Sequence, residues 1–347
     1  MKKLLTDYTL SELENIVTEL GEKKFRKTQI FQAISLGKDF CDMTALSKEF
    51  RQKLQDGYDA VGVKILEKLV SRDGTEKYLY ALRDGNVIEG VLMRYKYGNT
   101  LCVSTQVGCR MGCKFCASGI GGLVRNLSAG EIIGQVIAVN RDQGGNLDKR
   151  EVTNIVLMGS GEPLDNYDNV LRFLSLCKDE YGISLRNISL STSGIADKVK
   201  MLADSGLSVT LTISLHSPED KTRENLMPVN KAFNISQIIS SAKYYFEKTG
   251  RRVVFEYAMI KNVNDSIECA KKLASLVKGF PTHVNLIPLN YVKEQGALTP
   301  TGKERIEDFM KWLQDMGVSV TKRRTMGSDV AASCGQLRRK YLEENSN

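Results

Sequence analysis

Residues 153–178 read TNIVLMGSGEPLDNYDNVLRFLSLCK, and this stretch contains the unit from which the fold is built. An apolar run at 153–158 predicts a buried strand, and a glycine-containing polar loop follows it. Apolar residues at helical spacing then predict a helix at 166–178. A strand, a loop and a helix in this order are typical of a parallel sheet with right-handed crossover connections.

The same unit recurs along the chain from residue 100 onward. The expected strands are 100–105, 153–158, 187–192, 208–215, 252–260, 283–289 and 318–323. The expected helices are 128–140, 166–178, 196–205, 235–248, 266–278 and 302–316. This alternation predicts an α/β fold whose parallel sheet is either open or curled into a full or partial barrel.

The first hundred residues follow two other patterns. Residues 1–57 predict a small unit of three amphipathic helices, each ending at a glycine. Residues 58–97 alternate apolar and polar side chains and contain Asp73-Gly74 and Asp84-Gly85, which are strong hairpin signals. We therefore expect a helical accessory domain at 1–57, a β-meander connector at 58–97 and a catalytic α/β part at 98–347.

Composition narrows the class of protein. The chain has 347 residues, eight cysteines and a net charge of +8. Disulfide scaffolds contain about 8 to 10% cysteine, far more than this chain, so metal or redox chemistry is the better expectation. The sequence contains neither the ~18-residue apolar run of a membrane span nor the apolar region of a signal peptide, so we expect a cytoplasmic protein without a membrane partner. The positive charge favours a polyanionic partner.

Three cysteines provide the most specific chemical signal. Cys109, Cys113 and Cys116 are spaced Cys-x3-Cys-x2-Cys in VGCRMGCKFCASG, directly after the first strand of the α/β part. Thiolates at this spacing can surround a soft metal centre, such as a 4Fe-4S cluster with one iron left open. A structural zinc ion with a fourth ligand from Cys102, His216 or another residue is the alternative that the spacing leaves open.

Other polar segments also follow predicted strands. They are MGSGEPL, LSTSG, ISLHSP and IPLN, and the carboxyl ends of parallel strands meet on one rim of the sheet. Each segment has a structural alternative. Gly161 can simply shape a turn, Glu162 can cap the next helix, and Ser191 and Asn290 can satisfy loop backbone. His216 can be a structural histidine.

The cysteine motif, with Phe115 before the last cysteine and GEPL after the next strand, resembles the radical S-adenosylmethionine (SAM) enzymes. Longer segments, among them LSTSGI, LMPVN, EYAMIKNVND and RRTMGSDVAASCGQL, resemble the RlmN/Cfr family of RNA methyltransferases, most closely its RlmN branch. This resemblance spans about residues 86–338. It implies a partial (β/α)6 radical SAM barrel with a helical accessory domain that binds RNA.

The resemblance also implies roles for individual residues. Cys109, Cys113 and Cys116 would hold the 4Fe-4S cluster. SAM would contact Gly161, Glu162, Ser191, Ser214, Leu215, His216 and Asn290. Cys334 would carry the methyl group, Cys102 would resolve the protein–RNA adduct by forming a transient disulfide with Cys334, and Glu89 would accept a proton. An exposed strand carboxylate is the alternative for Glu89. Cys41, Cys177 and Cys269 are expected to be buried small apolar residues.

The implied reaction methylates carbon 2 of an adenosine in 23S rRNA and in tRNA, using two SAM molecules and an external one-electron reductant such as flavodoxin. Methylation of carbon 8, as in Cfr, is the nearest alternative. A non-catalytic, metal-stapled RNA-binding protein is the alternative of another class. Basic residues flank Cys334, with six Lys or Arg and one Asp within residues 321–340, and others cluster at residues 23–27. Both groups are candidates for phosphate contacts.

Overall fold

A sheet of parallel strands forms the centre of the molecule in the computed structural model, which describes residues 2–290 and 298–330. Neighbouring strands of this sheet run in parallel and follow one another in chain order. They are β6 (Gly98–Cys102), β9 (Asn154–Leu157), β10 (Ile188–Thr192), β11 (Thr210–Ser214), β12 (Val253–Met259), β13 (Thr282–Pro288) and β14 (Val320–Lys322). The predicted parallel sheet is confirmed.

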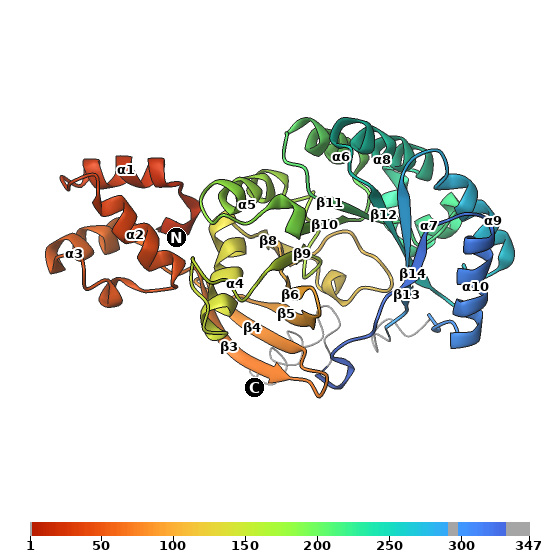
Figure 1. The fold of residues 1–347 in the computed structure, drawn as a ribbon, viewed down its shortest axis with the longest axis horizontal. Coiled ribbons are helices and arrows are strands. Elements are labelled where there is room, and N and C mark those ends of the chain that lie inside the picture. The colour runs from red at the N-terminus through yellow and green to blue at the C-terminus, as the bar shows by residue number, and fades with distance from the viewer. Residues whose placement is uncertain (1, 291–297, 331–347) are drawn as a thin grey trace.

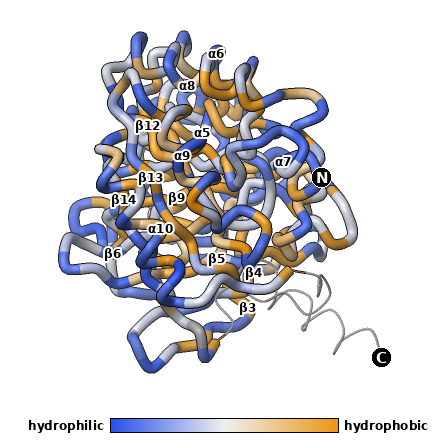
Figure 2. Tube along the Cα trace, turned by 90° about the vertical axis from the view of Figure 1, so that its right-hand side faces the viewer, coloured by the Kyte–Doolittle hydropathy of each residue, from blue (hydrophilic) through white to orange (hydrophobic). Residues whose placement is uncertain are grey.

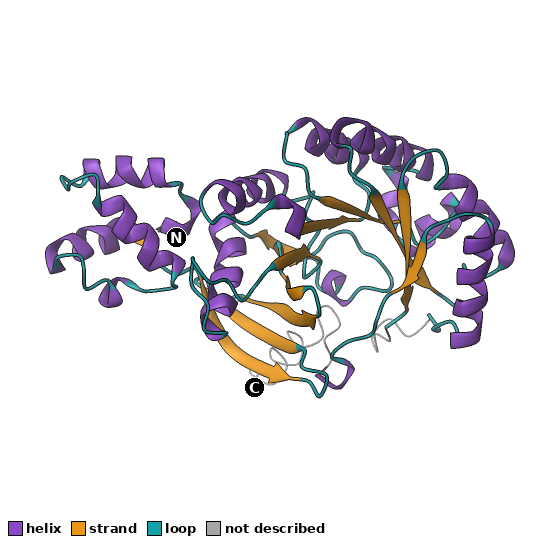
Figure 3. Ribbon diagram, viewed as in Figure 1, coloured by secondary structure: helices purple, strands orange, loops and turns teal. Residues whose placement is uncertain are grey.

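Helices cover the outer side of the curved sheet (Figures 1 and 3). They are α4 (Ala129–Asp142), α5 (Tyr167–Asp179), α6 (Ala196–Asp204), α8 (Ile235–Thr249), α9 (Ile267–Leu276) and α10 (Lys303–Asp315). Each lies within a few residues of its predicted range. The short α7 (Asp220–Leu226) was not predicted, because seven residues are too few for a clear helical period.

The β-meander at residues 58–97 belongs to the same sheet as the parallel strands. Strands β3 (Val63–Val70), β4 (Glu76–Leu82) and β5 (Val87–Tyr95) pair antiparallel with one another, and β5 pairs with β6. The two predicted hairpin turns are confirmed, since Gly74 and Gly85 have φ angles of 82° and 80°. In the described residues β14 and β3 form the two edges of the sheet, so the barrel is partial.

Three helices form the N-terminal unit, as predicted. They are α1 (Leu10–Glu19), α2 (Arg26–Ser35) and α3 (Lys48–Gly57), and they project from one side of the sheet in Figure 1. A parallel pairing of β1 (Lys3–Leu4) with β2 (Tyr58–Asp59), which was not predicted, closes the unit. Its buried apolar side chains are continuous with those of the sheet, so the N-terminal helices share one hydrophobic core with the rest.

Polar contacts also fix the N-terminal unit to the helices of the barrel. The side chain of Asp7 accepts a hydrogen bond from the amide of Gly130, and the hydroxyl of Thr6 donates to the carbonyl of the same glycine. Arg172 of α5 donates to the carbonyl of Asp7 and pairs with Glu12. The accessory helices are therefore held against the first turn of α4 and one face of α5.

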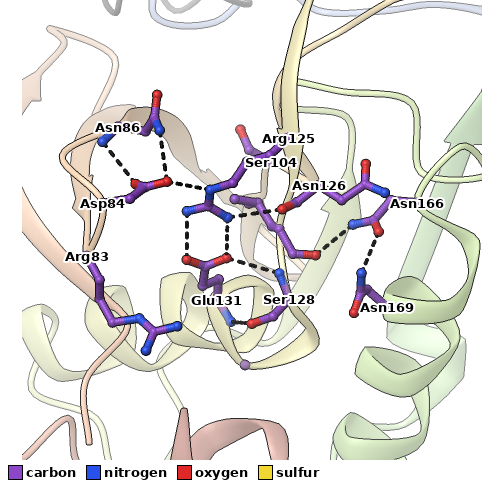
Figure 4. Close-up of polar contacts among 12 residues, drawn as sticks. Arg83, Asp84, Asn86, Ser104, Arg125, Asn126, Ser128, Glu131, Asn166 and Asn169 are labelled. Atoms are coloured by element: carbon purple, nitrogen blue, oxygen red, sulfur yellow. Dashed lines mark hydrogen bonds and ion pairs between the residues drawn. The ribbon is translucent and has the colours of Figure 1, made fainter. Parts of the chain in front are cut away.

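Arg125 joins three segments around the start of α4 (Figure 4). It lies in β8 (Leu123–Asn126), the strand that returns from the cysteine loop. Its guanidinium forms a two-pronged contact with Glu131, with N–O distances of 2.8 and 2.9 Å, and also pairs with Asp84 of the β4–β5 turn. Glu131 completes a capping box with Ser128 at the start of α4. Although burial disfavours its charge, these carboxylates raise the pKa of Arg125.

Hydrophobic residues run along the strands and alternate with hydrophilic ones around α6 and α8, as Figure 2 shows. Because the apolar residues of each outer helix lie on one side, that side packs against the sheet and the polar side faces solvent. Among residues 2–290 and 298–330, no helix combines the length and the apolar character that crossing a membrane requires.

The Arg125 contact generates a stability prediction. Replacing Arg125 with Met leaves the buried Glu131 carboxylate without its two-pronged partner, so the free energy of unfolding should fall by about 2 to 3 kcal/mol. Chemical denaturation monitored by circular dichroism measures this change. Lys53→Met is the control, because Lys53 pairs with Glu49 at the surface and should change stability by less than about 1 kcal/mol. Equal effects of the two substitutions would contradict the prediction.

Candidate active site

A cavity of about 540 Å³ lies at the carboxyl ends of the parallel strands. It is lined by side chains from the cysteine loop, from β5 and β6, from the ends of β9 to β13 and from the segment after β14. Ten of the predicted site residues line it: Cys102, Cys109, Cys113, Cys116, Gly161, Glu162, Ser191, Ser214, His216 and Asn290. The fold therefore brings these positions together, as the rim argument predicted.

Two glycines let the cysteine loop turn back on itself. Strand β7 (Gln106–Gly108) pairs with β8, and the amide of Cys109 donates to the carbonyl of Gly122. A side chain on Gly108 would place its Cβ 2.1 Å from that carbonyl oxygen, and the φ angle of Gly108 is +76°. Gly112 has a φ angle of +67°. The sequence-based expectation that glycines fold this loop tightly is confirmed at both positions.

The three loop cysteines are partly or fully enclosed. Cys109 is buried, Cys113 and Cys116 are partly buried, and all three face the cavity. Burial raises the pKa of Cys109 to about 12 and also raises the pKa of Cys113. Thiols protonated this firmly become ligands only when a metal displaces the proton.

A single metal ion and an iron-sulfur cluster require different arrangements of their cysteine ligands. Within residues 2–290 and 298–330, no three His, Cys, Asp or Glu side chains are placed to share one metal ion. Structural zinc requires its ligands to converge on one point, whereas each cysteine of a 4Fe-4S cluster binds a different iron. Three thiols that line one cavity are the donor set that a cluster with one open iron requires.

His216 packs against the cysteine loop. Its ring meets Phe115 edge-on, with ring centroids 4.7 Å apart, and its Nδ1 accepts a hydrogen bond from the amide of Ala258 at 2.9 Å. Burial lowers the pKa of His216 to about 3, so the imidazole is neutral near pH 7 and carries its proton on Nε2. The residue also has an unusual φ of 56°. His216 is thus both structurally fixed and part of the cavity wall.

Glu162 connects the GEPL loop with the end of β10. Its carboxylate accepts hydrogen bonds from the amides of Ser193, at 2.6 Å, and Leu164, at 3.0 Å. Burial raises the pKa of Glu162, and these hydrogen bonds oppose the rise. Both hydrogen-bond donors lie outside α5, so these contacts do not form the helix cap that the sequence left open. Beside it, Gly161 adopts a φ of +108°, and a Cβ there would lie 2.6 Å from Gln106.

A buried polar network spans the barrel interior, and the sequence reasoning did not find it. Glu256 of β12 accepts from the hydroxyl of Ser191 on β10 at 3.5 Å and pairs with Arg323, after β14, at 3.2 Å. Burial raises the pKa of Glu256, while the Arg323 cation opposes this rise. A glutamate within the apolar strand VVFEYAM was the signal that could have indicated an inward polar group.

Cys102 and Glu89 lie on neighbouring strands. Cys102 of β6 stands opposite Val91 of β5, and Glu89 lies two residues earlier on β5, on the same face as Val91. Burial raises the pKa of Cys102 to about 11, the Arg323 cation lowers it, and the Glu89 carboxylate raises it. Glu89 is buried and lies 3.0 Å from Lys77, so the alternative of an exposed strand carboxylate is wrong. Cys334 lies outside the described residues.

Arg223 holds the ends of β10 and β11 in place. Its fully buried guanidinium donates to the carbonyls of Ser193, Ser214 and Leu215 and to the side chain of Asn230, over 2.6 to 3.0 Å. Burial lowers the pKa of Arg223 to about 10. The predicted residue Leu215 is buried in the core, and its side chain is not part of the cavity wall. The backbone carbonyl of Leu215 instead accepts a hydrogen bond from the Arg223 guanidinium.

The remaining described cysteines differ from one another. Cys177 is fully buried, as predicted, and Cys269 is partly buried against the core. Cys41 is exposed, so the expectation that it packs as a small apolar residue is wrong. It lies in a single 3-10 turn, Phe40–Asp42, where Phe40 supplies the buried side chain.

Comparisons with known proteins agree with this geometry. Residues 4–58 match the model of the ribosomal RNA large subunit methyltransferase N-terminal domain, and residues 103–274 match the radical SAM superfamily. A relative from Alkaliphilus oremlandii, named probable dual-specificity RNA methyltransferase RlmN, is 51% identical, with 99% of this chain and 100% of that protein covered. The chain belongs to the RlmN family. It is therefore a radical SAM RNA methyltransferase.

Other members and one solved structure support this assignment. A Caldanaerobacter subterraneus protein with the same name is 49% identical, with coverage of 98% of this chain and 99% of that protein. The crystal structure of a radical SAM methyltransferase from Sphaerobacter thermophilus matches with a TM-score of 0.91 and 40% identity, covering 96% of this chain and 98% of that one. The resemblance to this family and the radical SAM fold are confirmed. Membership in the superfamily implies a 4Fe-4S cluster and SAM.

Arg223 generates a prediction for this site. Arg223→Met removes the donors that hold the carbonyls of Ser193, Ser214 and Leu215, so we expect the free energy of unfolding to fall by at least about 2 kcal/mol and SAM affinity to fall more than about tenfold. Denaturation and calorimetric titration of SAM into the cluster-loaded enzyme measure the two effects. Arg186→Met, at an exposed position, is the control. Unchanged SAM affinity in a folded Arg223→Met enzyme would refute the positioning role.

Proposed function

We propose that this enzyme methylates carbon 2 of an adenosine in 23S rRNA and of an adenosine in tRNA. The observation that carries the proposal is the single cavity that combines the three loop thiols with Glu162, Cys102 and the end of every parallel strand from β9 to β13. The name shared by relatives about half identical to this chain, dual-specificity RNA methyltransferase, supports two RNA substrates and the RlmN reaction over the carbon 8 alternative.

Cys109, Cys113 and Cys116 would hold the 4Fe-4S cluster. The ends of the next strands would hold SAM through Gly161, Glu162, Ser191, Ser214, Leu215, His216 and Asn290. When bound, the cluster supplies the electron that cleaves SAM to methionine and a 5′-deoxyadenosyl radical. The buried Glu162 carboxylate can accept from the SAM amino group, because each carboxylate oxygen has a second lone pair beyond the one that accepts from Ser193 or Leu164. An external reductant such as flavodoxin would provide the electron.

The proposed methyl transfer uses Cys334 as a carrier. An aromatic ring carbon of adenine is not nucleophilic, so it cannot displace the methyl group of SAM directly. The Cys334 thiolate can do so, taking a methyl group from one SAM molecule. The methyl group on Cys334 would then lose a hydrogen atom to the radical that a second SAM molecule supplies, and the carbon radical left on Cys334 would add to the adenine ring. Two SAM molecules are consumed in each turnover.

Cys102 would release the product. After the addition, the adduct would give one electron to the external redox carrier, and Glu89 would accept the proton that the ring carbon loses. The Cys102 thiolate would then attack the sulfur of Cys334, forming a transient disulfide while the bond from that sulfur to the transferred carbon breaks. That carbon takes up a proton and becomes the methyl group of the freed base. The buried ion pair with Lys77 holds the Glu89 carboxylate in a fixed orientation beside the strand that carries Cys102. The Arg323 cation favours the Cys102 thiolate, against the effect of burial. Arg323 is therefore proposed as a positioning residue.

The rest of the chain would serve RNA binding. We propose residues 1–57 as the accessory domain, residues 58–97 as the connector and residues 98–347 as the catalytic part. In the basic cluster, Lys24 and Lys27 both pair with Glu14. These pairs are at the surface and weak, so a phosphate can replace the carboxylate. Both RNA substrates are encountered in the cytoplasm.

The reaction is tested by identifying the modified nucleoside. RNA from cells that lack and then regain the gene is digested to nucleosides and analysed by mass spectrometry. The expected result is 2-methyladenosine from both 23S rRNA and tRNA, present only with the gene. Formation of 8-methyladenosine alone would establish the carbon 8 alternative. Absence of any methyladenosine, with no 5′-deoxyadenosine from reduced enzyme and SAM, would favour the non-catalytic RNA-binding protein.

The release step should depend on pH. Because the pKa of Cys102 is raised to about 11, its thiolate fraction should grow about tenfold per pH unit between pH 7 and 9, and adduct release should accelerate with it.

Arg323 should also affect the rate of release. Arg323→Met removes the cation that opposes the rise in the pKa of Cys102, so release should slow, whereas Arg323→Lys should restore part of the rate. Denaturing gels of quenched reactions measure the covalent protein–RNA species. A pH-independent release rate, equal in all three enzymes, would exclude this role.

A further inference from the structure

Two tyrosines at the β5–β6 turn form an exposed stacked pair. The rings of Tyr95 and Tyr97 are nearly parallel, at 6°, with centroids 4.9 Å apart. Tyr95 stands opposite Gly98 in the strand register, so Lys96 and Tyr97 form the tip of a tight turn. Tyr97 is 74% exposed, the largest exposed fraction among the exposed large hydrophobic residues of the described chain. The outer face of the pair is therefore an aromatic surface that is open to solvent.

The stacked pair continues the wall of the catalytic cavity. Val91, Met93 and Tyr95 alternate along β5 and all three line the cavity, and the hydroxyl of Tyr95 lies 3.5 Å from the sulfur of Met93. Tyr97 follows at the next alternate position. The outer ring is therefore backed by a ring that is itself fixed to the cavity wall.

A cation stands beside this surface. Arg324 is exposed and lines the same cavity from the segment after β14. Tyr95, the inner ring of the pair, lines that cavity too, so Arg324 and the stacked pair border the same cavity. The Arg324 cation also opposes the rise that partial burial and Tyr95 cause in the pKa of the Tyr97 hydroxyl. Lys96 adds a second exposed positive charge at the turn itself.

An aromatic face beside cations matches the chemistry of single-stranded RNA. Bases that leave a helix stack on aromatic side chains, and each contact contributes about 1 to 3 kcal/mol. Arginine and lysine beside such a platform bind the phosphates that connect the bases. An adenosine that enters the cavity must leave its own stack, and its neighbour then loses a stacking partner.

We propose that Tyr97, backed by Tyr95, receives an unpaired base next to the target adenosine while Arg324 holds an adjacent phosphate. This inference rests on the proposed function, because it requires an RNA adenosine in the cavity. It assigns the mouth of the cavity as a base-binding site, whereas the cavity itself receives the reacting base. Stacking of the neighbouring base on Tyr97 offsets part of the free energy that is lost when the target adenosine leaves its own stack. It therefore favours RNA in which the base next to the target is unpaired.

The test compares Tyr97→Ala, Tyr97→Phe and Met201→Ala. Met201 is 46% exposed on α6, away from the cavity lining, and controls for the loss of a surface apolar side chain. With a target RNA hairpin, Tyr97→Ala should weaken binding by about 5- to 150-fold, the equivalent of one lost stack. Tyr97→Phe and Met201→Ala should bind like the unaltered enzyme. SAM cleavage without RNA should be the same in all enzymes.

A fluorescent base localises the effect. With 2-aminopurine next to the target adenosine, the unaltered enzyme and Tyr97→Phe should quench its emission, and Tyr97→Ala should not. Arg324→Gln should reduce the salt dependence of RNA affinity by about one phosphate contact. If Tyr97→Ala binds the RNA and quenches 2-aminopurine as well as the unaltered enzyme does, the proposed base-binding site is wrong. It is also wrong if Tyr97→Ala loses binding only to a polypeptide and keeps its full affinity for RNA. If the unaltered enzyme methylates RNA while Tyr97→Ala is indistinguishable from it, only the platform fails. If the unaltered enzyme cleaves SAM but methylates no RNA, the proposed function fails.

Discussion

The parallel alignment of β6 and β9 to β14 decides where chemistry can take place in this protein. All of these strands end on the same rim, so the segments that follow them meet there although they are distant in the sequence. Cys102 and Arg323, which flank the first and last parallel strands, line one cavity for this reason. The antiparallel meander joins the same sheet and adds β5, with Glu89 and the tyrosine turn, to one side of that cavity.

Buried charges then fix the geometry of the rim. Arg223 binds three carbonyls at the ends of β10 and β11, Glu256 pairs with Arg323, and Lys77 pairs with Glu89. Removing a charge from water costs several kcal/mol, and a paired buried charge is therefore a weak source of stability. A paired buried charge instead orients the polar groups around it, because charges interact more strongly in the low-dielectric interior than in water. The state of Cys102 depends on this balance, since burial and two carboxylates oppose the Arg323 cation and the Met158 amide.

Much of the fold follows from short-range patterns in the sequence. Every predicted strand and helix of the α/β part is present, because the strands are continuous apolar runs and the helices have clear 3.6-residue periods. The patterns fail where an element is very short or where burial depends on distant partners. Helix α7 and the β1–β2 pair are examples of the first kind. The exposed Cys41 and the buried Glu89 are examples of the second.

The sequence by itself determined the βα alternation, the cysteine loop with its two glycines, and the family to which the chain belongs. These are local features, and local spacing is sufficient to specify them. Only the tertiary structure decided which charged residues face the cavity and which neighbours they meet. Glu256 and Arg323 lie 67 positions apart, and Tyr95 and Arg324 line one cavity from positions that are even further apart in the sequence. Such contacts depend on how the whole sheet curves, and the local sequence around each residue does not specify which distant side chain it will meet.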